Sequence, residues 1–226
     1  MIVLILTFAA LALSVHTRAH DVSSTPITWN REISRLVYDK CASCHRPGGT
    51  SFSLMTHPEV QARAVAVRDA ILSRRMPPWG AVKGFGTFRN DTSLSQEQIE
   101  LVSDWVQEDT PRGNNPRSLP KVPTFADLPP EGKVPAGAMA VSGTTTLDRA
   151  FVLDGVLPDQ IADNESMQVT AVLPGGRVEP IVWLYQYTNA YRHPYLFRRP
   201  LRLPAGTIIR GLPPEARLLL LPPQGS

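Results

Sequence analysis

The residues best suited to chemistry in this chain are Cys41, Cys44 and His45, which form a C-x-x-C-H motif. They include both cysteines of the 226 residues. Two thiols at this spacing can add to the two vinyl groups of a haem, and the adjacent imidazole then binds the iron from one side. The motif therefore predicts one covalent haem c, attached through Cys41 and Cys44, with His45 as the first axial ligand.

Pairs of cysteines at this spacing also occur in thiol redox sites and zinc sites. A zinc site needs further cysteine or histidine ligands, and apart from His45 only His16, His20, His57 and His193 remain. A thioredoxin-like motif follows a strand, whereas the residues before Cys41 have a helical pattern. The sequence therefore favours haem attachment over these two alternatives.

The N-terminus predicts export. Residues 1–15 are almost unbroken apolar sequence, and small residues at Thr17 and Ala19 are typical of a signal peptidase site. The apolar run is shorter than the roughly 20 residues that a membrane span needs. We therefore expect a signal peptide at 1–19, cleavage, no stable membrane span in the mature chain, and a periplasmic location.

Charge and composition narrow the class of protein. The chain has 23 basic and 20 acidic residues, which argues against a nucleic-acid-binding protein. Its 22 prolines cluster after residue 110, where they would interrupt helices repeatedly. The second half of the chain is therefore expected to contain few helices.

The first half predicts three helices around the motif. The first runs from Thr28 to Lys40, with apolar residues spaced at i, i+3 and i+4, and it delivers Cys41 at its end. Capping boxes at 56–59 and 95–98 open two more helices. A carbonyl in the loop at 46–49 is expected to accept the Nδ1 proton of His45.

The second axial position decides what a haem can do. Met76 follows the second predicted helix and precedes a proline, as a distal-ligand loop requires, and a thioether ligand raises the potential. The alternatives are an open position with Met76 as packing, or ligation by Met55 or His57. His57 lies in a capping box, where we expect a surface residue.

Donors are also expected near the haem propionates. Trp79 and Arg75 are candidates for this role by position, as are Arg46 and Arg74. The alternative is that the arginines are solvated and that Trp79 packs in a core.

From residue 137 the pattern changes to short β-strands. A Pro-rich linker is predicted at 118–136. Alternating and β-branched segments follow, and Pro174–Arg177 is a hairpin turn signal. About seven short strands predict an antiparallel β-sandwich, with segments at 139–141, 150–153, 168–173, 178–187, 195–203, 206–210 and 217–221.

Arginines dominate the charge late in the chain. Arg192, Arg198, Arg199, Arg202, Arg210 and Arg217 stand against Glu215 alone. They form either a docking face for an acidic redox partner or the solvated outer face of the sandwich.

The first half resembles the monohaem class I cytochromes c. The matching residues are Cys41, Cys44, His45, Met76 and the helix that carries Trp105. It is also similar to the cytochrome domain of a group of exported bacterial proteins, abundant in Acidobacteria-like genomes. That resemblance covers roughly residues 28–117 and rests on four stretches, namely CHRPGG, RRMPPWG, Phe-x-Asn-Asp and LSxEQIxLVxxWV.

The second half resembles the β-domain attached to the same cytochrome, which is similar to the C-terminal domain of copper type II, ascorbate-dependent monooxygenases. A copper site of that type needs several histidines, including His-x-His, and a methionine. This half has His193 alone, and its two methionines are far apart in the sequence. The copper site is therefore predicted to be absent, with His193 a loop or edge residue.

Together these observations predict a multidomain α + β chain. An all-α cytochrome c-like haem domain at 20–117 precedes the linker and an antiparallel β-sandwich domain at 137–226. The predicted function is electron transfer by an exported c-type cytochrome, with His45 and Met76 as axial ligands and redox proteins of the periplasm as partners. The alternatives are a haem enzyme with a labile sixth ligand, such as a peroxidase or oxygenase subunit, and a binding or sensor module.

Overall fold

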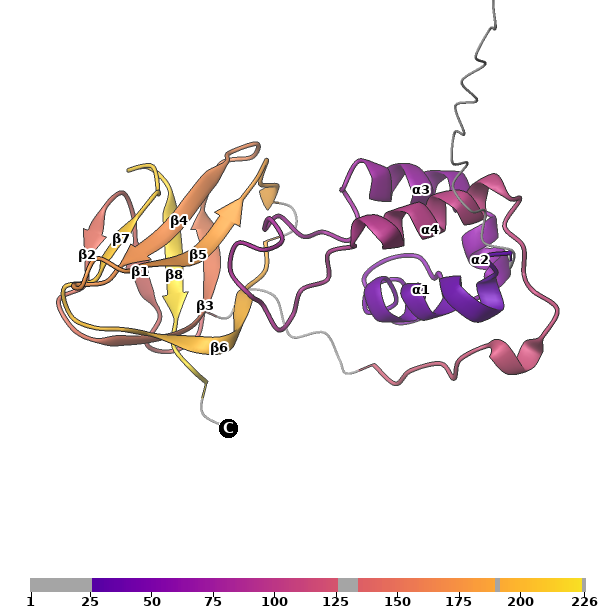
Figure 1. Ribbon diagram of the computed structural model, residues 1–226, viewed down its shortest axis with the longest axis horizontal. Helices are drawn as coiled ribbons and strands as arrows, with labels where there is room; N and C mark the ends of the chain where they lie inside the picture. The colour runs from indigo at the N-terminus through magenta and orange to yellow at the C-terminus, as the bar shows by residue number, and fades with distance from the viewer. Residues whose placement is uncertain (1–25, 126–133, 190–191, 225–226) are drawn as a thin grey trace, which may run out of the picture.

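The computed structural model describes residues 26–125, 134–189 and 192–224. The predicted signal peptide at 1–19 lies outside the described residues, as does the middle of the predicted linker. Helices gather at one end of the molecule and two sheets at the other, as Figure 1 shows. No helix in the described ranges is long and apolar enough to cross a membrane.

The helical half is built from short elements. None of its α-helices exceeds the 12 residues of α4. In chain order the elements are a π-helix at Trp29–Ile33, α1 at Ser34–Lys40, α2 at His57–Gln61, α3 at Ala64–Leu72, α4 at Gln96–Gln107 and a 3₁₀ turn at Pro116–Ser118.

Both predicted capping boxes are present. The Thr56 N–H donates to the Glu59 carboxylate at 2.8 Å, and the Ser95 N–H donates to Gln98 Oε1 at 2.9 Å. These contacts satisfy amide groups that the first helical turn leaves without partners. The second predicted helix is not continuous, however, because it breaks at Arg63, where φ is −126° and ψ is 11°.

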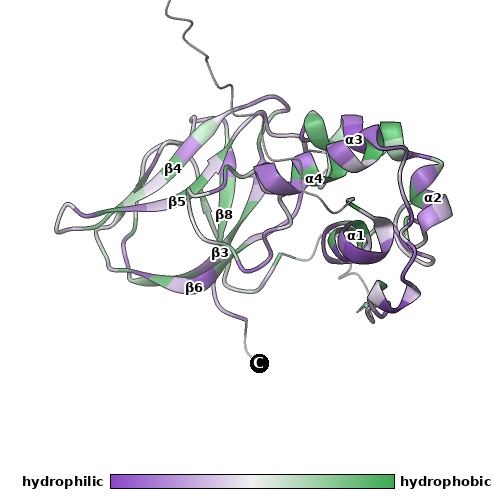
Figure 2. Ribbon diagram, turned by 45° about the vertical axis from the view of Figure 1, so that its right-hand side comes forward, coloured by the Kyte–Doolittle hydropathy of each residue, from purple (hydrophilic) through white to green (hydrophobic). Residues whose placement is uncertain are grey.

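One core holds the helices together. Trp29, Tyr38 and Trp105 are its large aromatic members, and Trp105 is 0% exposed. The indole N–H of Trp105 donates to the Pro111 carbonyl at 3.0 Å. In Figure 2, hydrophobic residues alternate with hydrophilic ones along α3 and α4, as in helices with one buried face.

Two antiparallel four-stranded sheets form the other half. One has the order β1-β8-β3-β6, and the other has the order β2-β7-β4-β5. The strands are β1 at Met139–Val141, β2 at Thr145–Thr146, β3 at Phe151–Gln160, β4 at Met167–Val172, β5 at Val178–Leu184, β6 at Tyr195–Leu203, β7 at Ile208–Arg210 and β8 at Arg217–Leu221.

The predicted hairpin joins β4 to β5. Val172 pairs with Val178, and the Leu173 N–H donates to the Arg177 carbonyl at 2.9 Å. Gly176 adopts φ = +82°, a conformation that favours glycine. Alternate residues of β4 are buried, and they share one core with residues of the other sheet.

The prediction of a separate all-α first domain is wrong. The segment between α3 and α4 leaves the helices and joins the sheets. Ala81 forms a β-bridge with Leu184, and Phe88 forms one with Phe197. Ala81 and Phe88 are 6% and 5% exposed, and both belong to the core of the sheets. The first half therefore mixes short helices with a segment that completes the sheet core.

Polar contacts hold this segment in place. The Arg89 guanidinium donates to the two oxygens of Asp154 at 3.0 and 2.7 Å, and to the Phe197 carbonyl at 2.7 Å. The Leu196 N–H donates to Asn90 Oδ1 at 3.0 Å. Arg89 and Asn90 thus connect the segment to β3 and β6.

Candidate functional site

The C-x-x-C-H motif forms a tight turn at the end of α1. The Cys41 N–H donates to the Val37 carbonyl at 2.9 Å, which continues the helical pattern by one residue. The N–H groups of Cys44 and His45 then donate to the Cys41 carbonyl at 3.2 and 2.9 Å. The turn gathers two sulfur atoms and one imidazole within five residues of the chain.

The loop after the motif folds back on it. The Ser51 N–H donates to the Cys44 carbonyl at 3.2 Å, and the Leu54 N–H donates to the His45 carbonyl at 3.0 Å. A Cβ atom at Gly49 would lie 2.2 Å from the Cys44 oxygen. Only glycine fits at this position, because any side chain would push the loop away from the motif.

The His45 ring is oriented by this loop. Its Nδ1 lies 3.0 Å from the Phe52 carbonyl oxygen. The centres of the His45 and Phe52 rings are 4.6 Å apart. A carbonyl oxygen only accepts, so Nδ1 carries the proton and the Nε2 lone pair is available in the neutral ring. The sequence predicted a carbonyl at 46–49 for this role. The residue is Phe52, which no local pattern marks.

The two cysteines have different surroundings. Cys41 packs against the helical core, and burial, followed by the nearby Asp39 charge, raises the pKa of its thiol to about 12. Cys44 is half-buried. The Ser43 hydroxyl lies 3.9 Å from the Cys44 sulfur. The site of Cys41 therefore suits an uncharged sulfur.

Met76 packs against the same helical core as Cys41. The chain turns at this point, and the Met76 N–H donates to the Ala70 carbonyl at 3.1 Å. Met55 also packs against this core, and its carbonyl accepts from the Tyr38 hydroxyl at 3.1 Å.

His57 is not the surface residue that its capping box suggested. Its Nε2 donates to the Thr110 carbonyl at 2.8 Å. Its ring lies 6.1 Å from Trp29 and 6.1 Å from Trp105. His57 therefore connects α2 to the residues after α4, and its Nε2 is engaged in this hydrogen bond.

Trp79 and Arg75 both make contacts with other parts of the protein. Trp79 packs against the core of the sheets, where its ring stacks on His193 at 5.1 Å and meets Tyr195 at 4.9 Å. Arg75 is exposed, and its Nε donates to the Ser73 hydroxyl at 3.1 Å. The packing alternative describes Trp79 correctly.

His193 lies in the loop that precedes β6, as the sequence predicted, and its ring is partly buried. Its ring nitrogens face two carbonyl oxygens, of Pro78 and Pro194, each at 3.1 Å. The ring also lies 4.6 Å from that of Tyr195. Burial lowers the pKa of His193, against the opposing effect of the two carbonyls. His193 therefore joins the Trp79 segment to β6.

The prediction of a haem c cofactor is corrected by the metal-ligating groups of the structure. The described ranges contain no group of three or more histidine, cysteine, aspartate or glutamate side chains that could hold a metal ion. The prediction of a covalent haem c is therefore not supported by the described residues.

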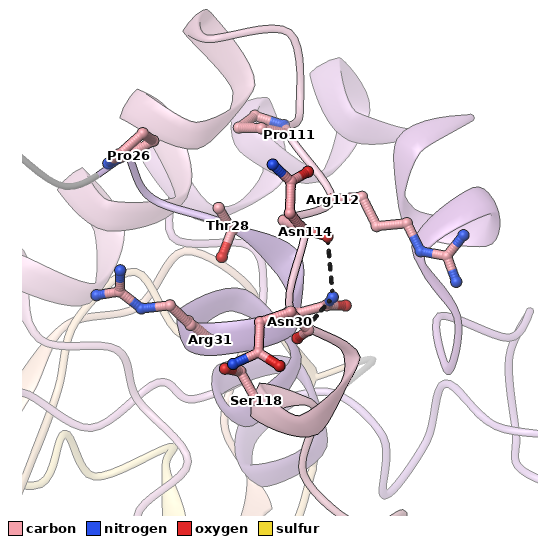
Figure 3. A pocket seen from close by; sticks show the side chains of 10 residues that line it. Pro26, Thr28, Asn30, Arg31, Pro111, Arg112, Asn114 and Ser118 are labelled. Atoms are coloured by element: carbon pink, nitrogen blue, oxygen red, sulfur yellow. Dashed lines mark hydrogen bonds between the residues drawn. The ribbon is translucent and has the colours of Figure 1, made fainter.

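A separate open pocket lies in the helical half (Figure 3). Its lining comes from the start of the π-helix and the residues before it, and from the turn after α4, including Thr28, Asn30 and Arg112. The Asn30 amide donates to the carbonyls of Gly113 and Asn115 at 3.1 and 3.3 Å. None of the predicted site residues lines this pocket. The side-chain amide of Asn30 already donates to these two carbonyls of the chain.

Comparisons of the chain with protein-family models, with curated proteins and with solved structures found no match in any of the three.

Proposed function

We propose that this chain is an exported electron-transfer protein whose redox segment is Cys41–His45, in keeping with the c-type cytochromes that its sequence resembles. The observation that carries the proposal is the orientation of His45. The Phe52 carbonyl lies 3.0 Å from its Nδ1, and this arrangement leaves the Nε2 lone pair available to another group.

The surroundings of the Cys41 and Met76 sulfur atoms also support a role in electron transfer. Cys41 and Met76 pack against one apolar core, where neutral sulfur is accommodated at little cost. Both residues precede the segment that enters the sheets.

A dithiol oxidoreductase is the competing use of two cysteines at this spacing. The thiolate is the nucleophile in thiol–disulfide exchange, so a reactive cysteine has a lowered pKa. The pKa of the Cys41 thiol is instead raised to about 12. At neutral pH this thiol stays protonated, which argues against exchange chemistry at Cys41.

Purification of the full chain from the periplasm of an exporting host tests the proposal. Voltammetry is expected to show a reversible couple in the wild type, and mass spectrometry of the peptide with Cys41 and Cys44 identifies the group on the two sulfurs. The couple should disappear in Cys41→Ala/Cys44→Ala and in His45→Gln, while Arg75→Gln serves as a matched control. A wild-type chain without any couple would contradict the function.

Met76 is tested in the same experiment. Met76→Ala should shift the midpoint potential if the Met76 thioether contacts the redox group, because the substitution would change the surroundings of that group. Met55→Ala is the control, since Met55 packs against the same core. An unchanged potential in Met76→Ala would remove Met76 from the redox centre.

A further inference from the structure

The exposed part of β6 is unusually basic. Arg198, Arg199 and Arg202 lie within five residues of one strand, and all three are exposed. β6 is the last strand of its sheet, and it carries no acidic residue. In Figure 2 hydrophilic and hydrophobic segments alternate along this strand.

These three arginines differ from others in the sheets. Arg177 pairs with Glu179 at 3.0 Å, and Arg192 pairs with Asp159 at 3.2 Å. For Arg198, Arg199 and Arg202 no ion pair or side-chain hydrogen bond exists within the described part of the chain. Their charge is therefore available to another molecule.

The neighbouring strand does not compensate this charge. β3 pairs with β6 and carries Asp154 and Asp159. Asp154 is 8% exposed and is held by Arg89, while Asp159 is shared by Arg192 and Arg217. Both carboxylates of β3 thus already have basic partners.

The outer edge of β6 is only partly covered. The Arg89 N–H donates to the Leu196 carbonyl at 2.8 Å, and the Arg198 N–H donates to the Thr87 carbonyl at 2.9 Å. The segment from the helical half thus covers the first part of the strand and ends where the arginines begin. The basic surface therefore begins beside this segment and continues along the uncovered part of β6.

We propose that Arg198, Arg199 and Arg202 form a docking surface for an acidic partner protein. Charge complementarity identifies the partner, because three uncompensated guanidinium groups attract and orient carboxylates. The concentration of charge is local, since the whole chain has only 23 basic against 20 acidic residues. That the partner exchanges electrons with this chain rests on the proposed function. The surface itself does not depend on it.

Charged side chains on edge strands also prevent sheets from pairing with each other. Under that explanation the arginines need no partner, and any exposed charge would serve as well. The two explanations differ in whether acidic ligands bind at these three positions in preference to other exposed arginines.

A binding measurement on the full chain separates them. The probe is a fluorescently labelled 20-residue peptide rich in glutamate, titrated at low ionic strength. The variant Arg198→Gln/Arg199→Gln/Arg202→Gln is compared with Arg112→Gln/Arg177→Gln/Arg210→Gln. The control removes the same charge from three other exposed arginines on a turn, on a hairpin and on β7.

We expect affinity to fall at least tenfold in the β6 variant and less than twofold in the control, with added salt weakening wild-type binding. Equal losses in both variants, or no loss in either, would overturn the proposal. Wild-type binding to phosphatidylglycerol vesicles but not to the peptide would also overturn it, in favour of a membrane surface. Because the probe is not redox-active, failed docking and a missing redox couple are distinguishable.

Discussion

The two halves of the molecule build their hydrophobic cores from different kinds of side chain. The helical core depends on a few large side chains, such as Trp29 and Trp105, carried by helices of 5 to 12 residues. The core of the sheets is built from many aliphatic residues of paired strands. Short helices contribute little stability of their own, so the helical half relies on each contact of its aromatic residues.

The segment from Trp79 to Asn90 complicates this comparison. It lies between two helices in the sequence, yet it packs with the sheets. The two cores therefore share a connection that two independent domains would lack. Variants in each core, and in the connection, show how strongly the halves depend on each other.

The largest expected effect is that of Trp105→Ala. Removing a fully buried indole leaves a cavity and should lower the free energy of unfolding by about 3–5 kcal/mol. Urea unfolding followed by far-UV circular dichroism measures the loss, with Trp105→Phe as the milder control. Leu218→Ala is the counterpart in the sheets, where Leu218 is 0% exposed.

If the halves unfold separately, Trp105→Ala shifts only the helical transition and Leu218→Ala only that of the sheets. A single transition that shifts in both variants would mean that the segment from Trp79 to Asn90 joins the halves into one cooperative unit. That result would overturn the distinction between the two cores as separate sources of stability.

An intermediate effect is expected at the connection itself. Arg89→Met leaves the Asp154 carboxylate, whose side chain is 11% exposed, without its bidentate partner. Because the Arg89 side chain is 44% exposed and solvent screens it, the expected loss is about 1–2 kcal/mol. Thermal unfolding measures this change.

The double variant Arg89→Met/Asp154→Leu is the control, because it removes both charges and should recover part of the loss. If Arg89→Met is as stable as the wild type, the pair does not hold the segment against the sheets. The connection between the halves would then rest on the β-bridges of Ala81 and Phe88 and on the contacts of Asn90 and Trp79.

Local features of this fold could be predicted from the sequence. The capping boxes at Thr56 and Ser95 and the hairpin turn at Pro174–Arg177 depend on residues a few positions apart, and all three are present. Most strands likewise follow from alternation and β-branched composition, although β2 was not predicted and β3 extends beyond its predicted segment to Gln160. Each of these signals is complete within a short window, so it does not depend on the rest of the fold.

Contacts between distant parts of the chain were not predictable in this way. The Trp79 segment has no repeating pattern, and its place is set by partners such as His193 and Phe197, more than 100 residues later. The carbonyl that orients His45 likewise belongs to Phe52, whose backbone role leaves no mark on residue type. In both cases the tertiary structure supplies a partner that spacing alone does not reveal.

The smallest expected effect concerns pH and the connection at His193. Its ring packs between Trp79 and Tyr195, and burial lowers its pKa in the folded state. The unfolded chain then binds more protons than the folded chain as the pH falls below about 6.5, so stability should decrease on acidification. His193→Gln cannot titrate, and its amide can still donate to the Pro78 carbonyl.

Thermal unfolding at pH 7.5 and pH 5.5 tests this for both proteins. The wild type should lose more stability than His193→Gln over this interval, and the difference should be smaller than the effect of Arg89→Met. Tyr195, the titratable ring in contact with His193, does not contribute, because burial raises its pKa far above this range. Identical losses in the two proteins would show that His193 binds protons equally in both states, so that its contacts connect the halves through packing rather than through its protonation state.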